Sequence, residues 1–242
     1  IREISIKFAN VDPVKDPVPV VPTVHYMMGG IPTTLNGQVR DGVKQKEVNG
    51  FYAVGECACV SVHGANRLGS NSLLDLIVFG KAAGQHILDS SKGKKLKKLP
   101  NDVTKKTIER LKKIDTKSSL EDPRELGEEL RAVMQKHCGV FRFPQLLNEG
   151  LVKVHELKQR IGNISIKDNS KVFNTARTEA LELQNLIEVA LATMASAKNR
   201  EESRGAHSRS DYPKRDDNSW LKHSLYNPKD GSLAYRPVKM KP

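Results

Sequence analysis

The sequence predicts an α/β region, followed by a small bundle of α-helices and an irregular C-terminal tail. Glycine, threonine, asparagine and β-branched residues are frequent in residues 23–55, which is typical of short strands joined by turns. Residues 73–87 carry apolar residues on nearly all helical faces and predict one helix. Apolar residues then recur at helical spacing up to residue 194, and the polar remainder from residue 201 shows no period. Strands and a helical bundle in one chain indicate at least two structural units.

The N-terminal part predicts an extended linker and short strands. Prolines at positions 13, 17, 19 and 22 exclude a helix from residues 12–22 and favour an extended linker. The dipeptides Asn36-Gly37 and Asp41-Gly42 are hairpin signals, so antiparallel strands are expected around them. Residues 51–54 are apolar and stop at Gly55-Glu56. This predicts a buried strand whose end faces a ligand if the sheet is an open α/β one.

A buried helix is expected over residues 73–87, because apolar residues cover nearly all of its faces. Ser72 and Asp75 have the spacing of a capping box at its start, although Asp is a weaker match than Glu at the second position. Residues 57–70 show no period and predict a loop. The N-terminus of the helix is therefore expected to point from the core toward this glycine-containing loop.

Three or four further helices are expected, since one of the four candidates is weaker. The clearest has Asp122 as N-cap and Pro123 as its first helical residue, and it stops before Gly139. A second follows, a third begins at Asn174, and the weaker one spans residues 104–114. The residues at helical spacing are Leu126, Leu130, Val133, Met134 and His137 in the first, Leu147, Leu151, Val154, Leu157 and Ile161 in the second, and Leu183, Ile187, Ala190, Leu191 and Met194 in the third.

The composition limits the classes of protein. The chain has 242 residues, of which 38% are hydrophobic, enough for one large or two small domains. Its longest apolar candidate for a membrane span, residues 73–79, is too short and contains Asp75, so no bilayer crossing is expected. The three cysteines, Cys57, Cys59 and Cys138, form neither a disulfide framework nor a zinc motif, which fits a reducing compartment and predicts no metal site. The first residues are neither an initiator methionine nor a signal peptide, so the chain is expected to begin inside a longer parent.

The net charge of +12 raises the question of a nucleic-acid or anionic-membrane partner. The excess is densest at Lys92, Lys94, Lys95, Lys97, Lys98, Lys105 and Lys106. No aromatic residue interleaves these lysines to stack on bases, so a solvated connector is favoured and no nucleic acid is expected. A basic helical module that uses residues 92–200 to bind an acidic partner or nucleic acid remains the alternative, supported by charge alone.

Polar residues converge on predicted loops and caps. They are His25, Glu56, His63, Asn66, Arg67, Asn71 and Ser72. An arginine between glycines is suited to hold a carboxylate through its two-pronged guanidinium, and the first residues of a helix, Ser72 and Leu73, favour an anion or a carbonyl oxygen. Each residue alone also fits a role without function in binding, such as a surface histidine, a solvent-facing glutamate or an ordinary N-cap. Together they indicate an anion or cofactor site built around a helix N-terminus and an arginine.

Four strings carry a resemblance to a known family. They are HYMMGGIPT at residues 25–33, FYAVGE at 51–56, SVHGANRLGSNSLLDLIVFG at 61–80 and ESRGAHSRSDYPKRDDNSW at 202–220. In these strings the chain resembles the flavoprotein subunits of succinate dehydrogenase and, more loosely, their fumarate reductase relatives. The resemblance implies that His25 and Arg67 bind a dicarboxylate substrate and that Glu56 holds the ribose of FAD. It also implies that Ser72 and Leu73 meet the flavin ring through backbone N–H groups, where a helix N-terminus would stabilise the reduced flavin.

The reaction implied by the resemblance is oxidation of succinate to fumarate, with a hydride passing to flavin N5 and a proton to a base. The family's proton-shuttling arginine lies in a segment that no part of this chain matches, so no catalytic residue is expected here. The chain also has no G-x-G-x-x-G after a strand, so the part of the fold that binds the FAD pyrophosphate is missing. Alone, the chain is expected neither to hold FAD tightly nor to turn over succinate.

The resemblance implies partners, a location and a domain plan. Electrons would pass to an iron-sulfur subunit, held by membrane-anchor subunits, and then to quinone, at the inner face of the bacterial cytoplasmic membrane or the matrix side of the mitochondrial inner membrane. Residues 1–22 would end a capping domain and return from it, 23–92 would form the C-terminal portion of a Rossmann-like FAD-binding domain, 93–200 a helical domain and 201–242 an irregular tail. A fumarate reductase or L-aspartate oxidase flavoprotein is the nearest alternative.

Overall fold

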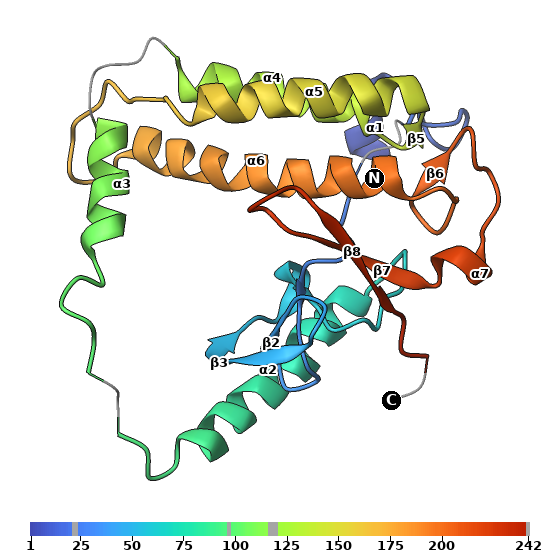
Figure 1. The fold of residues 1–242 in the computed structure, drawn as a ribbon. Helices are drawn as coiled ribbons and strands as arrows, with labels where there is room; N and C mark the ends of the chain where they lie inside the picture. The colour runs from blue at the N-terminus through green and yellow to red at the C-terminus, as the bar shows by residue number, and fades with distance from the viewer. Residues whose placement is uncertain (21–23, 96–97, 116–120, 241–242) are drawn as a thin grey trace.

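The computed structural model describes residues 1–20, 24–95, 98–115 and 121–240. Figure 1 shows a row of helices along one side of the molecule and a smaller mixed α/β part along the other, with a C-terminal hairpin between them. Residues Arg2–Ala9 form helix α1, and Arg2 then pairs with Asp12 through two hydrogen bonds of 3.0 and 2.8 Å. Residues 10–20 form no helix or strand, as their prolines predict, and Pro22 lies outside the described residues. The linker is not extended throughout, because the Lys15 and Asp16 N–H groups both donate to the Asp12 carbonyl oxygen at 2.9 Å and close a turn.

The mixed part contains short strands that pair in twos. Its strands are β1 (Ile31–Pro32), β2 (Gln38–Asp41), β3 (Lys46–Tyr52) and β4 (Ala58–Cys59), and its short 3₁₀ helix is η1 (Gly55–Cys57). β2 pairs with β3 in antiparallel fashion, and β1 pairs with β4 in parallel. Gly37 and Gly42 lie in the turns that flank β2, with φ of +72° and +36°, so both turn signals are confirmed.

The buried strand predicted over residues 51–54 is only partly correct. β3 ends at Tyr52, Ala53 is buried, and Phe51 is 51% exposed. The reason is that β3 has β2 as its strand neighbour and no second neighbour within the described residues, so part of its surface faces solvent.

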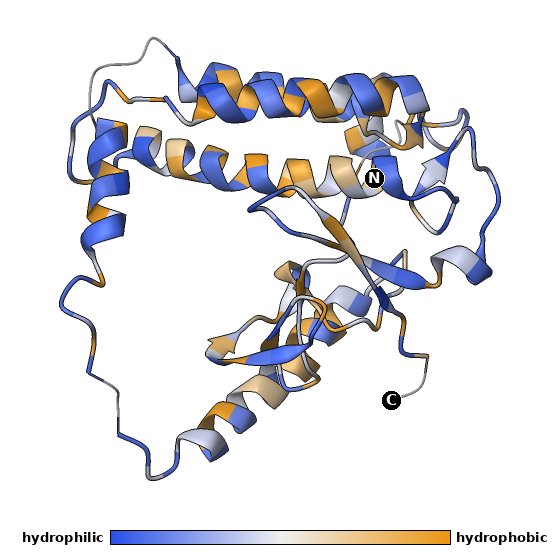
Figure 2. Ribbon diagram, viewed as in Figure 1, coloured by the Kyte–Doolittle hydropathy of each residue, from blue (hydrophilic) through white to orange (hydrophobic). Residues whose placement is uncertain are grey.

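The prediction of a buried helix over residues 73–87 was wrong for this chain. The segment forms helix α2 (Asn71–Ser91), but within it Asp75 and Ala83 are the residues classed as buried, and Leu73 and Ile77 are 64% and 68% exposed. Figure 2 shows apolar residues along α2. The strand hairpin and η1 cover one face only, where the Tyr52 hydroxyl and Nδ1 of His86 lie 2.9 Å apart.

The predicted capping box of α2 was also wrong. The N-cap residue is Ser70, whose φ of +64° is left-handed and whose side chain makes no capping hydrogen bond. Asp75 does not close a box, because its carboxylate binds a histidine of the preceding loop.

The helical bundle matches the sequence prediction closely. Its helices are α3 (Lys105–Asp115), α4 (Pro123–His137), α5 (Pro144–Ile161) and α6 (Thr175–Asn199), with α4, α5 and α6 side by side in Figure 1. Asp122 accepts a hydrogen bond from the Arg124 N–H at 2.8 Å, so the predicted N-cap is confirmed. The helix predicted to begin at Asn174 does so, with Asn174 as its N-cap, which accepts a hydrogen bond from the Arg177 N–H at 2.7 Å.

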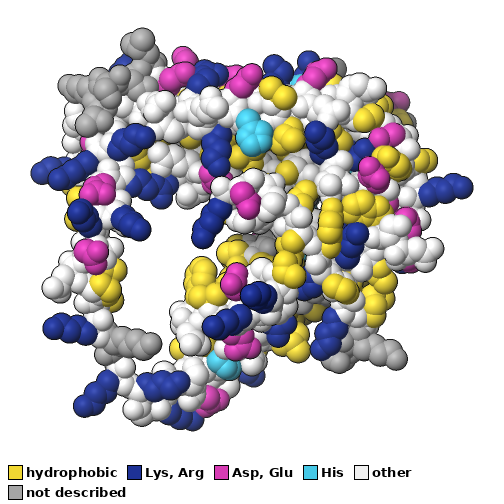
Figure 3. Space-filling view, in the orientation of Figure 1, with side chains coloured by type: hydrophobic (Ala, Val, Ile, Leu, Met, Phe, Trp, Pro, Cys, Tyr) yellow, Lys and Arg dark blue, Asp and Glu magenta, His cyan; other side chains and the backbone are white. Residues whose placement is uncertain are grey.

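The bundle holds the main hydrophobic core. Its fully buried side chains include Ile114, Leu126, Leu147, Val154, Leu157, Ile161, Ile187, Leu191 and Met194. The lysine-rich connector between α2 and α3 is exposed wherever it is described, and Lys97 lies outside the described residues. Lys and Arg side chains spread over the face shown in Figure 3 with acidic side chains among them, so no single basic patch supports the charge-based alternative there. Among the described helices, none is both long and apolar enough to cross a membrane.

The tail is not irregular throughout, and that prediction was wrong for residues 217–237. Its elements are β6 (Ser208–Arg209), which pairs with β5 (Phe141–Arg142), then α7 (Asp217–Trp220), β7 (Lys222–Tyr226) and β8 (Leu233–Pro237). β7 and β8 form an antiparallel hairpin. Its turn contains the dipeptide Asp230-Gly231, a signal that sequence analysis missed, and Gly231 has a φ of +71°.

The hairpin bridges the two parts of the molecule. Tyr226 of β7 packs against the core of the helical bundle. On the opposite side, Arg236 of β8 donates a hydrogen bond to the Gln45 side chain, and Ser61 and His223 are hydrogen bonded at 2.8 Å. The tail therefore touches both the bundle and the loops of the mixed part.

Candidate functional site

Three loops meet at the N-terminus of α2. They are residues 25–30, the η1 turn and residues 61–70. The Glu56 carboxylate ties the first two together, because its Oε1 accepts a hydrogen bond from the Met27 N–H at 2.8 Å. The predicted FAD ligand Glu56 is thus fixed against the segment that contains the predicted substrate ligand His25.

Glycines allow these loops to approach one another closely. A Cβ on Gly30 would lie 2.5 Å from the Cys57 carbonyl oxygen, so the first loop packs directly on the η1 backbone. A Cβ on Gly55, which has a φ of +77°, would overlap the side chain of Leu76 on α2. The η1 turn and Glu56 are therefore seated on the first turns of α2.

A buried pair fastens the third loop to α2. His63 Nε2 lies 2.8 Å from Asp75 Oδ2, and their side chains are 15% and 5% exposed. The buried Asp75 carboxylate needs a partner, because desolvation of an unpaired charge is costly. The pair sets the position of the loop that contains Arg67.

Tyr26 connects this pair to Arg67. The Arg67 guanidinium carbon lies 4.4 Å from the centre of the Tyr26 ring, and the His63 ring meets the same ring edge-on with centres 6.2 Å apart. Burial, together with the carboxylates of Asp75 and Glu56, raises the pKa of the Tyr26 phenol above its ordinary value, while Arg67 acts in the opposite direction. Tyr26 is therefore a neutral, fixed platform for the guanidinium.

Arg67 is held in place, but not all of its hydrogen-bond donors are used. Its Nη1 donates to the Leu68 carbonyl oxygen at 3.0 Å. Its Nε is buried and has no hydrogen-bond partner among the described residues. A buried N–H of a permanent cation without an acceptor is costly, and an anionic ligand would satisfy it.

The remaining predicted site residues lie around this cluster. His25 is exposed and directly precedes Tyr26 in the chain. Ser72 is half-buried in the first turn of α2, and the Leu73 N–H donates to the Ser70 carbonyl oxygen at 3.2 Å. The structure thus brings Glu56, Arg67 and the α2 N-terminus together, with the backbone of His25 beside them.

Sequence analysis missed the part that Tyr26 and Asp75 play here. Asp75 carried a signal, because it is the one carboxylate within the apolar run of residues 73–79, where a charge demands a partner. Tyr26 carried none, since 37 residues separate it from His63, and only the fold brings their rings together.

The residues present fit one side of a flavin site. The second carboxylate oxygen of Glu56 accepts no hydrogen bond from the described residues, so it is available to a hydroxyl group. Nothing lies within 4 Å of a Cβ placed on Gly29, which leaves the adjacent backbone open to a ligand. No group of three or more His, Cys, Asp or Glu side chains in the described part of the chain is arranged to hold a metal ion.

Comparisons with known proteins give consistent results along the chain. Residues 1–73 match a family model described as an FAD binding domain, and residues 127–242 match one described as the fumarate reductase flavoprotein C-terminal region. The succinate dehydrogenase flavoprotein subunit of Coxiella burnetii is 51% identical over 247 residues, which cover 100% of this chain and 42% of that protein. The mitochondrial succinate dehydrogenase [ubiquinone] flavoprotein subunit of Oryza sativa is 43% identical, with 99% of this chain and 39% of that protein covered.

Solved structures show the same relationship. A variant of the E. coli quinol fumarate reductase FrdA superposes with a TM-score of 0.86 at 37% identity, with 99% of this chain and 41% of that chain covered. Mycobacterium smegmatis Sdh1 in complex with UQ1 superposes with a TM-score of 0.83 at 30% identity, with 99% and 40% covered. The chain spans about two fifths of the length of these relatives.

Proposed function

Because this chain belongs to the succinate dehydrogenase flavoprotein subunit family, we propose that it forms the substrate-facing and part of the flavin-facing wall of an enzyme that oxidises succinate to fumarate. The observation that carries this proposal is the state of Arg67. Its guanidinium rests on the Tyr26 ring, and its buried Nε has no acceptor among the described residues. A substrate carboxylate supplies that acceptor.

In this proposal Arg67 and His25 bind the carboxylates of the substrate. A guanidinium holds a carboxylate through two parallel hydrogen bonds, which fixes both the position and the plane of the ligand. The buried pair of His63 and Asp75 fastens the loop of residues 61–70 to α2, and the Tyr26 ring packs against the Arg67 guanidinium. These residues orient the substrate for reaction and do not themselves remove its hydrogens. We propose that the proton acceptor is supplied from outside this chain, as the family resemblance implies.

The proposed cofactor is FAD. Glu56 would hold a ribose hydroxyl through its free oxygen, and the backbone N–H groups of Ser72 and Leu73 would face the flavin ring. When bound, FAD would accept the two electrons that leave succinate with its hydride. The positive end of the α2 dipole would stabilise negative charge at this position.

The partners proposed are those that this chemistry requires. Electrons would leave toward an iron-sulfur subunit and then quinone, with the flavoprotein peripheral on the inner face of the bacterial cytoplasmic membrane, or on the matrix side of the mitochondrial one, through membrane-anchor subunits. Fumarate reduction uses the same ligands in the opposite direction, and the fumarate reductase FrdA is among the similar structures. L-Aspartate oxidase chemistry differs by one amino group on the substrate.

The exposed apolar side chains of α2 support a larger flavoprotein. Leu73, Leu74, Leu76, Ile77 and Val78 are all between 48% and 68% exposed. Contiguous apolar surface of this kind marks a contact face. We propose that the remaining length of the flavoprotein covers it and completes the flavin site, so that this chain alone neither retains FAD nor oxidises succinate.

The test is succinate oxidation with a dye as electron acceptor, in the full-length flavoprotein. Removal of a buried, hydrogen-bonded charge costs about 2–5 kcal/mol, so Arg67→Ala should lower kcat/KM by roughly 30- to 5,000-fold with bound flavin unchanged in absorbance. Arg67→Lys keeps the charge without the planar fork and should fall between Arg67→Ala and the parent. Arg131→Ala, at an exposed position of α4, is the matched control.

The activity of Arg67→Ala decides whether Arg67 binds the substrate. If Arg67→Ala retains activity while its flavin content equals that of Arg131→Ala, Arg67 is not a substrate ligand and the proposal fails. Substrate choice separates the alternatives, because an L-aspartate oxidase would turn over L-aspartate in preference to succinate.

A further inference from the structure

A tight turn in the tail presses against the loop that carries Arg67. Arg204 and His207 close this turn by two backbone hydrogen bonds, from the Arg204 N–H to the His207 carbonyl at 2.8 Å and from the His207 N–H to the Arg204 carbonyl at 3.0 Å. Gly205 and Ala206 form its tip, and Gly205 has a φ of +58°. Two backbone hydrogen bonds between the same pair of residues make this turn rigid.

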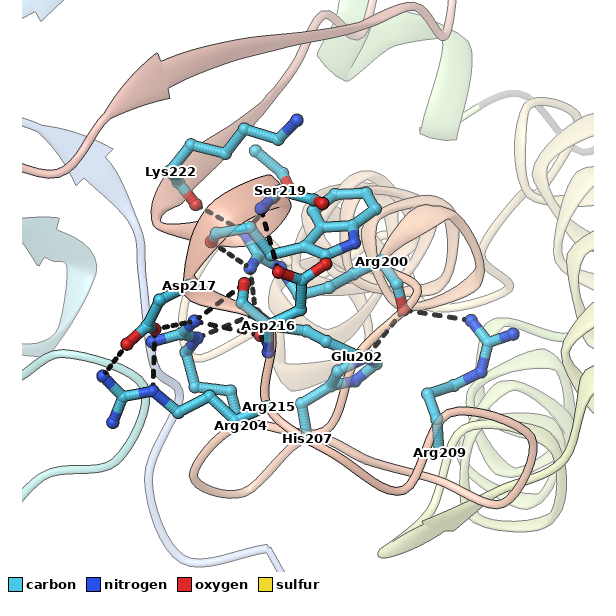
Figure 4. A network of polar contacts seen from close by, with 12 residues as sticks. Arg200, Glu202, Arg204, His207, Arg209, Arg215, Asp216, Asp217, Ser219 and Lys222 are labelled. Carbon is cyan, nitrogen blue, oxygen red and sulfur yellow. Dashed lines mark hydrogen bonds and ion pairs between the residues drawn. The ribbon is translucent and has the colours of Figure 1, made fainter.

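A buried network holds the base of the turn in place (Figure 4). Glu202 is 0% exposed and accepts hydrogen bonds from Arg200 at 2.6 Å and from Arg204 at 2.8 and 3.0 Å. It also accepts one from the Asp216 N–H at 3.0 Å. On the other side of the tip, His207 Nε2 donates to the Arg200 carbonyl oxygen at 3.1 Å. Both ends of the turn are thus anchored to the end of α6.

The tip contacts the backbone of Ala65, two residues before Arg67. A Cβ on Gly205 would lie 2.5 Å from the Ala65 carbonyl oxygen and 2.6 Å from its carbonyl carbon. The Ala206 N–H donates to the same carbonyl oxygen at 3.4 Å. The space between turn and loop therefore admits only a glycine at position 205.

A second tail contact holds the same loop four residues earlier. Ser61 Oγ lies 2.8 Å from Nε2 of His223, which belongs to β7. β7 also packs on α6, the helix that anchors the Glu202 network. The tail thus touches the loop at Ser61 and Ala65, while the pair of His63 and Asp75 fastens the same loop to α2.

We propose that the turn at residues 204–207 is a positioning element for the substrate arginine, and that Gly205, through its contact with Ala65, sets where the Arg67 guanidinium lies. The inference rests on the proposed function of Arg67. Gly205 and His223 are positioning residues, since neither is proposed to touch the substrate. The tail would in this way make dicarboxylate affinity depend on the docking of the helical bundle.

The experiment compares Gly205→Ala with Gly231→Ala in the full-length, FAD-loaded flavoprotein. Both glycines lie in tail turns at positive φ, +58° and +71°, so the backbone strain of an alanine is matched. Only Gly205 has neighbours, because nothing lies within 4 Å of a Cβ placed on Gly231. The KM for succinate and the inhibition constant for malonate are measured, with bound flavin determined by absorbance. Malonate has a single carbon between its carboxylates, so it reports binding without reaction.

A displaced arginine should raise both constants by about 10- to 100-fold in Gly205→Ala relative to Gly231→Ala, at equal bound flavin. A merely structural defect would reduce the fraction of active enzyme and leave both constants unchanged, and that result overturns the inference. Arg67→Ala in the same series keeps the two proposals distinct. If it loses dicarboxylate affinity and Gly205→Ala does not, the positioning role fails while the proposed function stands.

His223→Ala covers the case in which Gly205→Ala does not fold. This variant removes the contact with Ser61 without adding atoms. A rise of at least about threefold in both constants at equal bound flavin supports the positioning role, whereas unchanged constants refute it.

Discussion

Replacement of the buried Glu202 by glutamine should destabilise the protein by about 3 kcal/mol. Oε1 of Glu202 accepts from Arg200 and from Nε of Arg204, and Oε2 accepts from Nη2 of Arg204 and from the Asp216 N–H. An amide keeps one acceptor oxygen and points an NH₂ group at the other two donors, so two hydrogen bonds are lost in either orientation. Bonds to charged groups contribute about 1.5–3 kcal/mol each and a neutral backbone bond about 1. The less costly orientation keeps the oxygen at the Oε1 position and loses one bond of each kind, which gives about 3 kcal/mol.

The assay is urea unfolding followed by the fluorescence of Trp220, the single tryptophan of the chain, whose ring lies 5.1 Å from the Arg200 guanidinium carbon. Glu201→Gln is the matched control, because Glu201 is the exposed neighbour of Glu202. A loss of about 3 kcal/mol corresponds to a fall in Tm of about 6–12 °C for a chain of this size. If Glu202→Gln unfolds at the same urea concentration as Glu201→Gln, the network does not stabilise the tail and our account of the turn loses its support.

Three further results are expected. Gly150→Ala should destabilise the bundle by about 1–3 kcal/mol, because its Cβ would overlap the side chains of His137 on α4 and Met194 on α6. The control is Gly84→Ala at an exposed position of α2, which should be neutral or stabilising, and thermal unfolding compares the two variants. Burial lowers the pKa of His207 and of His223 to about 4, below the ordinary value of about 6.5, so the unfolded chain binds more protons between these values. The free energy of unfolding should therefore fall as the pH is lowered from about 6.5 toward 4, and either His→Gln substitution should flatten this slope in urea titrations. Burial also raises the pKa of the Cys138 thiol, so a thiol reagent followed by mass spectrometry should label it only after unfolding, and early labelling would contradict its place in the core.

The helical bundle could be predicted from the sequence because its signals are local. Asp122 and Asn174 are residue types that cap helices, and each lies directly before an apolar pattern that needs no distant residue to be recognised. The tail hairpin carried one local signal, the dipeptide Asp230-Gly231, which was overlooked. The rest of its placement could not be predicted, because its short, half-buried strands contact Ser61 and α6, which only the fold brings near.

The sequence singled out the candidate ligand-binding residues, but not the residues that hold them in place. Arg67 and Glu56 stand out among glycines, and family resemblance gives each a role that remains a prediction. Their anchors are a histidine and a carboxylate twelve positions apart and a turn more than 130 residues away, joined by packing and not by any pattern of spacing. Such contacts decide where a ligand group lies, and sequence periodicity carries no record of them.

The failure of the buried-helix prediction for α2 is itself informative. An apolar pattern on nearly all faces describes the environment to which a helix is adapted, and that environment includes whatever packs on it. The described residues cover one face of α2, so the pattern and the structure disagree at Leu73 and Ile77, and they agree at Ala83. The disagreement lies next to the first turn of α2, where the flavin is proposed to bind. An uncovered apolar face beside the proposed cofactor site is what a flavoprotein would show if the length of the relatives that this chain does not span covered the helix and completed the site. We therefore expect the full-length flavoprotein both to retain FAD and to bury the apolar face of α2.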